Sequence, residues 1–388
     1  MEATVCDGRY QIVKTLGCGG FGTLYEAIDL QMERMCAIKE YTPPQNIQGT
    51  GTAYRDGIYR FREEATILKR LSWYSGVVKY YSYFEENGSA YITMVLLQGD
   101  TIGHIVKKRK FTLQETNKIF LKAAEIADVC HEKGGILHRD LTPENIFLLN
   151  TGEVKLIDFG TAVFWRKSSA ASPMEAKLEY APPEQCHSNS VQGKFTDVYS
   201  LAASYYYVLS GKRIPSALDR EKGAGYIPLY QICPETKGRI SDAVDEALIL
   251  WPEERTQTMK EFMAALKPGL KPVSKAVPIP AGKTLYLQHI NQGAKGECTE
   301  FRSGQKIRIG RGEENEIILH DPGYSISRRH CEIRYDESGN QLKILDTSLN
   351  GTFINGRRLL KNEETAVPLP AKIRLANPNF EFLIGVKE

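Results

Sequence analysis

The pattern of apolar positions divides the first 267 residues into a strand-rich beginning and a helix-rich remainder. Alternation of apolar and polar residues, the period of a half-buried strand, recurs in five short segments near the N-terminus. These segments are residues 10–16, 23–30, 35–41, 77–83 and 90–97. Between the third and the fourth, Phe61, Ala65, Leu68 and Leu71 recur at helical spacing and predict a helix over residues 55–71.

The helices predicted after residue 110 include two that belong to a buried scaffold. Thr112 and Glu115 form a capping-box pair, which starts a helix with apolar residues at helical spacing as far as Cys130. Residues 196–211 are hydrophobic nearly all round, as is typical of a helix at the centre of a lobe. A last helix over residues 258–266 ends just before Pro268, because proline cannot continue it.

The character of the chain changes after residue 267. Residues 268–282 are rich in proline and lysine and contain no acidic residue, so they predict a semi-extended linker. Beyond the linker, short alternating segments separated by polar turns predict a β-sandwich. These segments are residues 284–290, 306–310, 316–320, 330–335, 342–346, 351–354, 372–376 and 380–385.

Composition narrows the class of protein only a little. The 388 residues are 42% apolar and 25% charged, as in an ordinary globular protein of two to three domains. The net charge of +3 gives no reason to expect a nucleic-acid partner. Apolar runs are too short to cross a bilayer, and the N-terminus lacks a signal-peptide pattern, so we expect no membrane span. Eight cysteines without metal-binding spacing predict free thiols in the cytoplasm.

The densest candidate chemistry lies in two motifs, HRD at residues 138–140 with Asn145, and DFG at residues 158–160. Transfer of a phosphoryl group needs metal ions to neutralise charge and a carboxylate to orient the attacking hydroxyl. Asp140 is placed for the second task, and Asn145 and Asp158 for the first. Turn formation alone would explain isolated Asp and Asn residues. Both motifs in order and at this separation favour phosphate chemistry.

Two features nearer the N-terminus agree with that reading. Residues 17–22 form a GxGxxG that is followed by a strand, whereas a dinucleotide-binding fingerprint opens a helix. We therefore predict a flap whose backbone N–H groups close over phosphates. Lys39 is flanked by apolar residues, and because burial of an unpaired ammonium is costly it should have an acidic partner. The helix over residues 55–71 offers Glu63 and Glu64.

Together these motifs resemble the serine/threonine protein kinases of the eukaryotic-like type found in bacteria. The resemblance implies an α+β architecture, with a bilobal kinase fold over residues 10–267 that uses ATP and magnesium, or manganese, to modify protein substrates. It implies Asp140 at the substrate hydroxyl, Asn145 and Asp158 at the metal, and Lys39 paired with Glu64 in preference to Glu63. The implied nucleotide contacts, besides Lys39, are Leu16, Gly17, Gly19, Gly22, Leu24, Ala37, Met94 and Leu96.

One pair of positions departs from the family pattern. Thr142 stands where HRDxKPEN has lysine, and Lys177, counted back from Glu184 of the APPE motif, stands where the family has threonine. We hypothesise that Lys177 brings its ammonium from the opposite wall to the place that Thr142 leaves. The alternative is a true loss, which would favour a pseudokinase that serves as a phosphopeptide-binding adaptor. The choice between serine/threonine and tyrosine substrates stays open here.

The segment between the DFG and APPE motifs contains Ser168, Ser169 and Ser172 among small residues. By resemblance, Arg139 receives a phosphate placed on this segment, and we predict that phosphorylation of one of these serines raises activity. The resemblance also implies two structural charges. Asp197 braces the backbone of the HRD loop, and Glu184 pairs with Arg255.

The turns of the C-terminal segments resemble those of the forkhead-associated (FHA) domain, over residues 283–388. They include Gly310-Arg311, SRRH at residues 327–330 and Asn350-Gly351. The resemblance implies an all-β sandwich that binds a phosphothreonine-containing protein through Arg311, Ser327, Arg328 and Asn350, with His330 in a structural role. An arginine can bind a phosphate through two N–H groups, and a serine hydroxyl can donate to it. Hairpin formation is the alternative for Asn-Gly pairs, and Asn355-Gly356 fits it as well.

Overall fold

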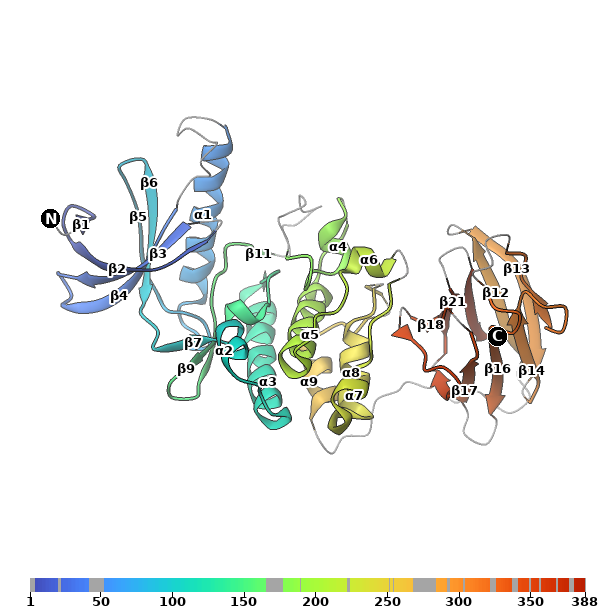
Figure 1. The fold of residues 1–388 in the computed structure, drawn as a ribbon. Coiled ribbons are helices and arrows are strands. Elements are labelled where there is room, and N and C mark those ends of the chain that lie inside the picture. Colours follow the sequence, from blue (N-terminus) through green and yellow to red (C-terminus); the bar gives the residue numbers. More distant parts are fainter. Residues whose placement is uncertain are drawn as a thin grey trace.

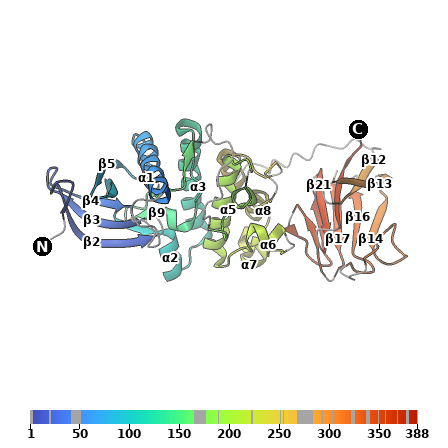
Figure 2. The same ribbon diagram turned by 90° about the horizontal axis from the view of Figure 1, so that it is seen from above.

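The computed structural model covers the 388-residue chain. It describes residues 4–387 apart from several gaps, which are residues 20–21, 42–51, 165–176, 189, 222–223, 251, 254, 268–283, 292–293, 303, 322–325, 337–340, 349, 356, 368 and 377–379. Two views show a mixed α/β part followed by a β-sandwich next to the helices of the C-terminal lobe (Figures 1 and 2). This is the α+β kinase-like architecture with an all-β sandwich that the sequence predicts.

The N-terminal lobe is a sheet with one long helix, α1 (Thr52–Leu71), packed against it (Figure 1). The strand order is β1-β2-β3-β4-β6-β5. The bounds are Thr4–Val5 for β1, Tyr10–Gly19 for β2, Gly22–Asp29 for β3, Arg34–Glu40 for β4, Tyr80–Glu86 for β5 and Ser89–Val95 for β6.

One predicted strand of this lobe begins later than expected. The sequence pattern placed a strand over residues 77–83, but β5 begins at Tyr80. Val77 instead forms a parallel bridge with Leu156, and the Val78 N–H donates to the Leu156 carbonyl at 3.2 Å. The two valines contact Leu156 of the other lobe, which explains why they are apolar. A pattern of apolar residues along one segment does not reveal such a contact between lobes.

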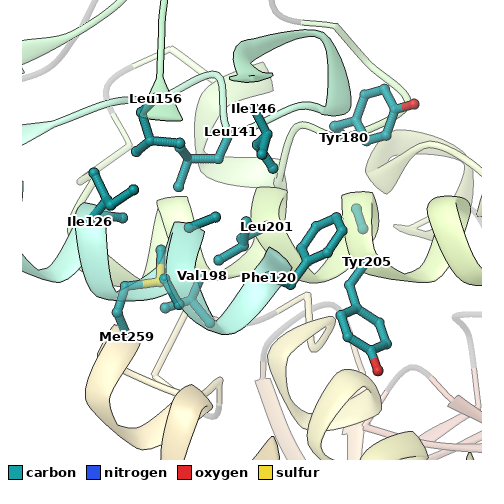
Figure 3. Packing of buried hydrophobic residues seen from close by; sticks show 14 of the residues in the cluster. Phe120, Ile126, Leu141, Ile146, Leu156, Tyr180, Val198, Leu201, Tyr205 and Met259 are labelled. Carbon is teal, nitrogen blue, oxygen red and sulfur yellow. The ribbon is translucent and has the colours of Figure 1, made fainter. Parts of the chain in front are cut away.

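The C-terminal lobe is built round α3 (Leu113–Val129) and α5 (Lys194–Ser210). The capping box of Thr112 and Glu115 is confirmed. Figure 3 shows Phe120 of α3 beside Leu201 and Tyr205 of α5, while Met259 lies near Val198. The other helices are α2 (Ile102–Lys108), α4 (Pro183–Cys186), α6 (Ala217–Glu221), α7 (Leu229–Ile232), α8 (Arg239–Ala247) and α9 (Met259–Leu266). The short strands are β7 (Gly99–Thr101), β8 (Ile136–Leu137), β9 (Ile146–Leu149), β10 (Val154–Leu156) and β11 (Val163–Phe164).

The C-terminal β-sandwich consists of two sheets, with strand orders β13-β12-β22-β21-β18-β19 and β15-β14-β16-β17-β20. The first sheet contains β12 (Thr284–Asn291), β13 (Ala294–Arg302), β18 (Thr352–Ile354), β19 (Arg357–Arg358), β21 (Ala371–Leu375) and β22 (Glu381–Val386). The second contains β14 (Lys306–Gly310), β15 (Ile317–Ile318), β16 (Cys331–Asp336), β17 (Gln341–Asp346) and β20 (Glu364–Val367). The sequence pattern missed β13, an edge strand with little alternation, and the short strands β19 and β20.

The described part of the chain contains no helix that combines the length and apolarity of a bilayer-crossing segment. All eight cysteines are free thiols.

Candidate active site

A buried lysine on β4 links the sheet, α1 and the DFG motif. Lys39 Nζ lies 2.8 Å from Glu64 Oε1 and 2.9 Å from Glu64 Oε2, and 3.0 Å from Asp158 Oδ1. Glu64 is buried and Glu63 is not part of this contact. A Cβ atom on Gly160 would lie 3.2 Å from Asp158 Oδ1 and 3.3 Å from Glu64 Oε2. Glycine at this position therefore leaves room for the three charged groups to meet.

The charges in this trio shift one another's proton affinities. The Lys39 ammonium lowers the pKa of Asp158 to about 2, so Asp158 is ionised throughout the neutral range. Although burial opposes it, the carboxylates of Asp158 and Glu64 raise the pKa of Lys39. Burial raises the pKa of Glu64 more than the ammonium lowers it. The trio therefore leaves the Asp158 carboxylate and the Lys39 ammonium side by side, where the N-terminal lobe meets the DFG motif.

Asp140 of the HRD motif lies among polar partners. The Asn145 amide nitrogen donates to the Asp140 backbone carbonyl at 2.9 Å and to Asp140 Oδ2 at 2.7 Å. Because the amide nitrogen is turned towards Asp140, the amide oxygen is the atom of Asn145 available to a cation. Phe159 is fully buried, with its ring 4.6 Å from that of His138, which keeps the DFG backbone against the HRD loop.

Lys177 reaches this group from the opposite wall. Its Nζ donates to Asp140 Oδ2 and to Thr142 Oγ1, each at 3.0 Å. Thr142 is buried, whereas the Lys177 side chain is 44% exposed, so its ammonium stands at the edge of the cleft. The swapped lysine and threonine are thus hydrogen-bonded to each other and to Asp140.

A second buried carboxylate holds the backbone of the HRD loop. Asp197, on α5, accepts from the His138 N–H at 2.8 Å and from the Arg139 N–H at 2.6 Å. His131 Nε2 lies 2.7 Å from the same carboxylate. Burial alone would raise the pKa of Asp197, but the hydrogen bond to His131 and the other nearby donors hold it below its usual value. Sequence reasoning missed His131, because it lies beyond any motif, in the turn that follows α3.

The residues predicted to contact the nucleotide lie on the strands of the N-terminal lobe or directly after them. Ala37 and Met94 pair across β4 and β6 and are buried, Leu24 packs against the core, and Leu16 is exposed. Leu96 packs against the core just after β6. Gly17 and Gly19 lie in β2. Gly22 has a φ of +150°, and a Cβ there would lie 2.1 Å from the Glu40 carbonyl oxygen, so only glycine fits the turn.

The APPE motif is anchored below the cleft. Glu184 accepts from both terminal nitrogens of Arg255, at 2.6 and 3.1 Å, and all the groups are buried. The Gln185 side chain donates to the Arg139 carbonyl at 2.8 Å, which ties this motif to the HRD loop. The three serines predicted to carry a regulatory phosphate, Ser168, Ser169 and Ser172, lie outside the described residues.

A candidate metal site can be tested against the groups present. The described residues contain no cluster of three or more His, Cys, Asp or Glu side chains suited to a metal ion. Magnesium, however, is commonly held by one or two protein oxygens together with the phosphates of a nucleotide. The Asp158 carboxylate and the Asn145 amide oxygen supply such oxygens, so the residues present fit a magnesium ion that arrives with ATP.

The loops at one end of the sandwich bring the predicted phosphopeptide residues together. The Arg311 N–H donates to the Ser327 carbonyl at 3.1 Å, and the Gly312 N–H donates to the Arg328 carbonyl at 3.0 Å. A Cβ on Gly310 would lie 2.3 Å from the Arg328 carbonyl oxygen, so glycine allows this close approach.

The buried His330 ties the third loop to the first two. The Ser327 N–H donates to its Nδ1 at 3.1 Å, and its Nε2 lies 3.0 Å from the Gly351 carbonyl. Asn350 therefore lies next to the loop that carries Ser327. Arg311, Arg328 and Asn350 are exposed at the tips of these loops.

Comparison with known proteins agrees with both parts of this geometry. Residues 10–266 match the model of the protein kinase domain, and residues 307–376 match that of the FHA domain. The chain belongs to the protein kinase family. Its kinase domain holds the Lys39 and Asp140 groups described above, and its FHA domain carries the Arg311 loops.

Several bacterial relatives are similar to the chain. The serine/threonine-protein kinase PknA of Nostoc is 31% identical over 284 residues, which are 70% of this chain and 49% of that protein. The serine/threonine-protein kinase D of Synechocystis is 27% identical over 277 residues, or 69% of this chain and 53% of that protein. PknA of Mycobacterium tuberculosis is 27% identical over 298 residues, or 71% and 65%. The chain thus spans about half to two-thirds of the length of these relatives.

Proposed function

We propose that this chain transfers the γ-phosphoryl group of ATP to serine or threonine hydroxyls of proteins, and that its FHA domain recruits phosphothreonine-containing proteins. The observation that carries the proposal is the position of Lys177, whose ammonium contacts Asp140 and Thr142 at 3.0 Å. That contact supports the proposal that Lys177 supplies the charge which the HRD loop lacks at Thr142. The names of the relatives support serine or threonine as the substrate hydroxyl.

Each side chain in the cleft has a distinct task in this proposal. Asp140 orients the substrate hydroxyl and accepts its proton, while Lys177 stabilises the charge that develops on the transferred phosphoryl group. Lys39, held by Glu64, contacts the α- and β-phosphates. Asn145 and Asp158 would hold a magnesium ion that neutralises phosphate charge. Leu16, Leu24, Ala37, Met94 and Leu96 surround the adenine, and the glycines at 17, 19 and 22 allow the flap to lie over the phosphates.

Arg139 is proposed to receive a regulatory phosphate. Its side chain is buried, and its Nε has no hydrogen-bond partner among the described residues. A phosphate on the segment between the DFG and APPE motifs would supply charge-assisted bonds to such a group. The proposal thereby links Arg139 to the serines at 168, 169 and 172.

In the FHA domain, Arg311 and Arg328 are proposed to bind the phosphate, Ser327 to donate a hydroxyl hydrogen bond and Asn350 to hold the peptide backbone. The exposure of Arg311, Arg328 and Asn350 supports a ligand that arrives from solution. The free cysteines suit a reducing cytoplasm, where we propose that the protein works.

Incubation of the full chain with γ-labelled ATP, magnesium and a general protein substrate tests the proposed activity. We expect labelled phosphoserine or phosphothreonine in the substrate. Asp140→Asn should reduce the transfer rate by about 10²- to 10⁴-fold, the usual contribution of a positioned base. Nucleotide affinity should change little. An equal transfer rate in the wild type and Asp140→Asn would contradict the proposal.

A further inference from the structure

The FHA domain turns one face of its first sheet towards the C-terminal lobe of the kinase domain. Along β18 and β21, Ile354 and Ile373 point into the sandwich core, whereas Phe353 and Arg374 alternate with them and face outward. Phe353 is nevertheless only 3% exposed. Its ring lies against Gly225, where an added Cβ would be 2.9 Å from Phe353 Cε1. The kinase domain therefore covers this face.

Polar contacts fix the same interface. Arg357 of β19 forms an ion pair with Asp245 of α8 at 2.9 Å. Asp245 is buried and also accepts from the Tyr226 hydroxyl at 2.7 Å. Arg374 Nη1 donates to the Arg220 carbonyl at 3.3 Å. Figures 1 and 2 both show the sandwich beside α6, which contains Arg220.

A cavity of about 570 Å³ lies between the two domains. The kinase domain lines it with residues that include His187, Ser190 and Arg220, and the FHA domain with Lys372 and Arg374. Since both domains supply its walls, the cavity exists only while they are docked.

Two arginines in the wall of the cavity are buried, and some of their N–H groups lack a hydrogen-bond acceptor. Arg220 is 1% exposed and Arg374 is 6% exposed. Arg220 Nη1 donates to the Tyr199 hydroxyl and to the Leu248 carbonyl. Arg220 Nε and Arg374 Nε and Nη2, however, have no acceptor in the described part of the chain. A buried donor without an acceptor and a buried charge without a counter-charge are both costly.

Four glutamates line the cavity, but none of them forms an ion pair with Arg220 or Arg374 in the described part of the chain. Glu184 is bound by Arg255 at 2.6 Å, Glu221 by His187 at 2.9 Å and Glu381 by Lys372 at 2.8 Å. Glu253, which also lines the cavity, is exposed. Burial lowers the pKa of Arg374, and the nearby charge of Arg220 lowers it further, against the opposite effect of Glu381.

We propose that this cavity is a binding site for a phosphate group, held by the guanidinium groups of Arg220 and Arg374. A phosphate offers several acceptor oxygens and a charge of about −1.5 to −2 at neutral pH, which matches two arginines with free N–H groups. The site is separate from the Arg311 loops and does not depend on the proposed activity. A phosphate that contacts both domains binds only the docked form and therefore stabilises docking.

Titration of the full chain with inorganic phosphate tests the site. The titration is done by calorimetry at constant ionic strength, with chloride as the reference salt and with ADP filling the nucleotide cleft. An Arg311→Ala background removes the central cation of the proposed phosphopeptide site. We expect saturable binding that Arg374→Gln weakens by about 10- to 100-fold, the usual range for a charge-assisted contact. Arg374→Lys keeps the charge but loses the paired N–H donors of the guanidinium. Its phosphate affinity should therefore lie between that of the parent and that of Arg374→Gln.

Arg334→Gln is the matched control, because Arg334 pairs with Glu364 at an exposed site on the other sheet. It should leave phosphate affinity unchanged. Arg374→Gln removes an unpaired buried charge, so it should fold. In the parent, phosphate should also slow hydrogen exchange in β18 and β21, and this protection should vanish in Arg374→Gln. Equal phosphate affinity in Arg374→Gln and its parent, or an absence of saturable binding, would overturn the proposal.

The phosphate can be free or attached to a side chain, and a parallel titration with O-phosphoserine separates these sources. Affinity for O-phosphoserine with the same dependence on Arg374 supports a site that accepts a phosphorylated side chain. Affinity for inorganic phosphate alone, again dependent on Arg374, supports a site for free phosphate.

Discussion

The kinase domain and the FHA loops are both proposed to bind phosphate groups, but they hold their cations differently. In the cleft, Lys39 is fixed by two carboxylates and Lys177 by Asp140 and Thr142. In the FHA domain, hydrogen bonds of the backbone and His330 fix the loops, while Arg311 and Arg328 are exposed at their tips. Catalysis needs charges already in position. Recognition needs rigid loops with accessible side chains.

Removal of the charge at the centre of the cleft should have the largest effect. Lys39→Met leaves the buried Glu64 and Asp158 without their shared cation, so we expect phosphoryl transfer to fall by about 10³-fold or more. Steady-state kinetics with a peptide substrate measures the loss. Lys122→Met is the control, because Lys122 pairs with Glu125 at an exposed position on α3. A rate near that of the wild type in Lys39→Met would show that the cleft is not organised round this lysine.

The next largest effect is expected when a cation is removed from the FHA loops, and it should appear in the affinity for a phosphopeptide. Arg311→Ala is expected to weaken a phosphothreonine peptide by about 10- to 100-fold, as one charge-assisted contact contributes about 1.5 to 3 kcal/mol. Fluorescence anisotropy with phosphorylated and unphosphorylated peptides measures it. Arg308→Ala, which removes an arginine paired with Glu316, should bind the peptide as the wild type does. If Arg308→Ala and Arg311→Ala weakened binding equally, general positive charge and not the loop geometry would explain recognition.

Gly160 tests how tightly the trio of charges is packed. A Cβ at this position would lie 3.2 Å from Asp158 Oδ1 and 3.3 Å from Glu64 Oε2, so Gly160→Ala must displace these two carboxylates by a few tenths of an ångström. We expect a loss of about 10-fold in transfer rate, because a small misplacement of reacting groups is costly. Gly152→Ala, in a turn between β9 and β10, is the comparison: with a φ of +85° and no atom within 4 Å of an added Cβ, it strains the backbone without touching the trio. Its rate should stay within about twofold of the wild type.

The pH dependence of stability should show the smallest effect. Asp158 has its pKa lowered from 3.8 to about 2, so its ionised form stabilises the fold above pH 3.8, and this contribution is lost as the pH falls towards 2. Asp158→Asn should therefore lose less stability than the wild type over that interval. Chemical denaturation at a series of pH values measures the difference. Parallel curves for the two proteins would show that Lys39 does not hold the Asp158 carboxylate ionised.

The sequence predicted the α+β fold and the contact of Lys39 with Glu64, because these motifs tie chemistry to local structure. The proximity of Lys177 to Thr142 could be predicted, because each residue stands where the family pattern has the other residue type. The strand β13 was not predictable, since its residues do not alternate strongly between apolar and polar. The interface between the domains was also hidden. Phe353 and Arg374 occupy ordinary outward positions of strands, and no local pattern tells which partner covers an outward face.

The most direct test of the account is the reciprocal exchange of the two residues that depart from the family pattern. Lys177→Thr should reduce transfer by about 10²-fold, because it removes a charge that stabilises the transition state. The double variant Thr142→Lys with Lys177→Thr should recover most of that loss, since the ammonium then approaches the same place from the HRD loop. The account predicts this rescue in kcat at saturating ATP. Wild-type kcat in Lys177→Thr alone would contradict the claim that the opposite wall supplies the catalytic charge.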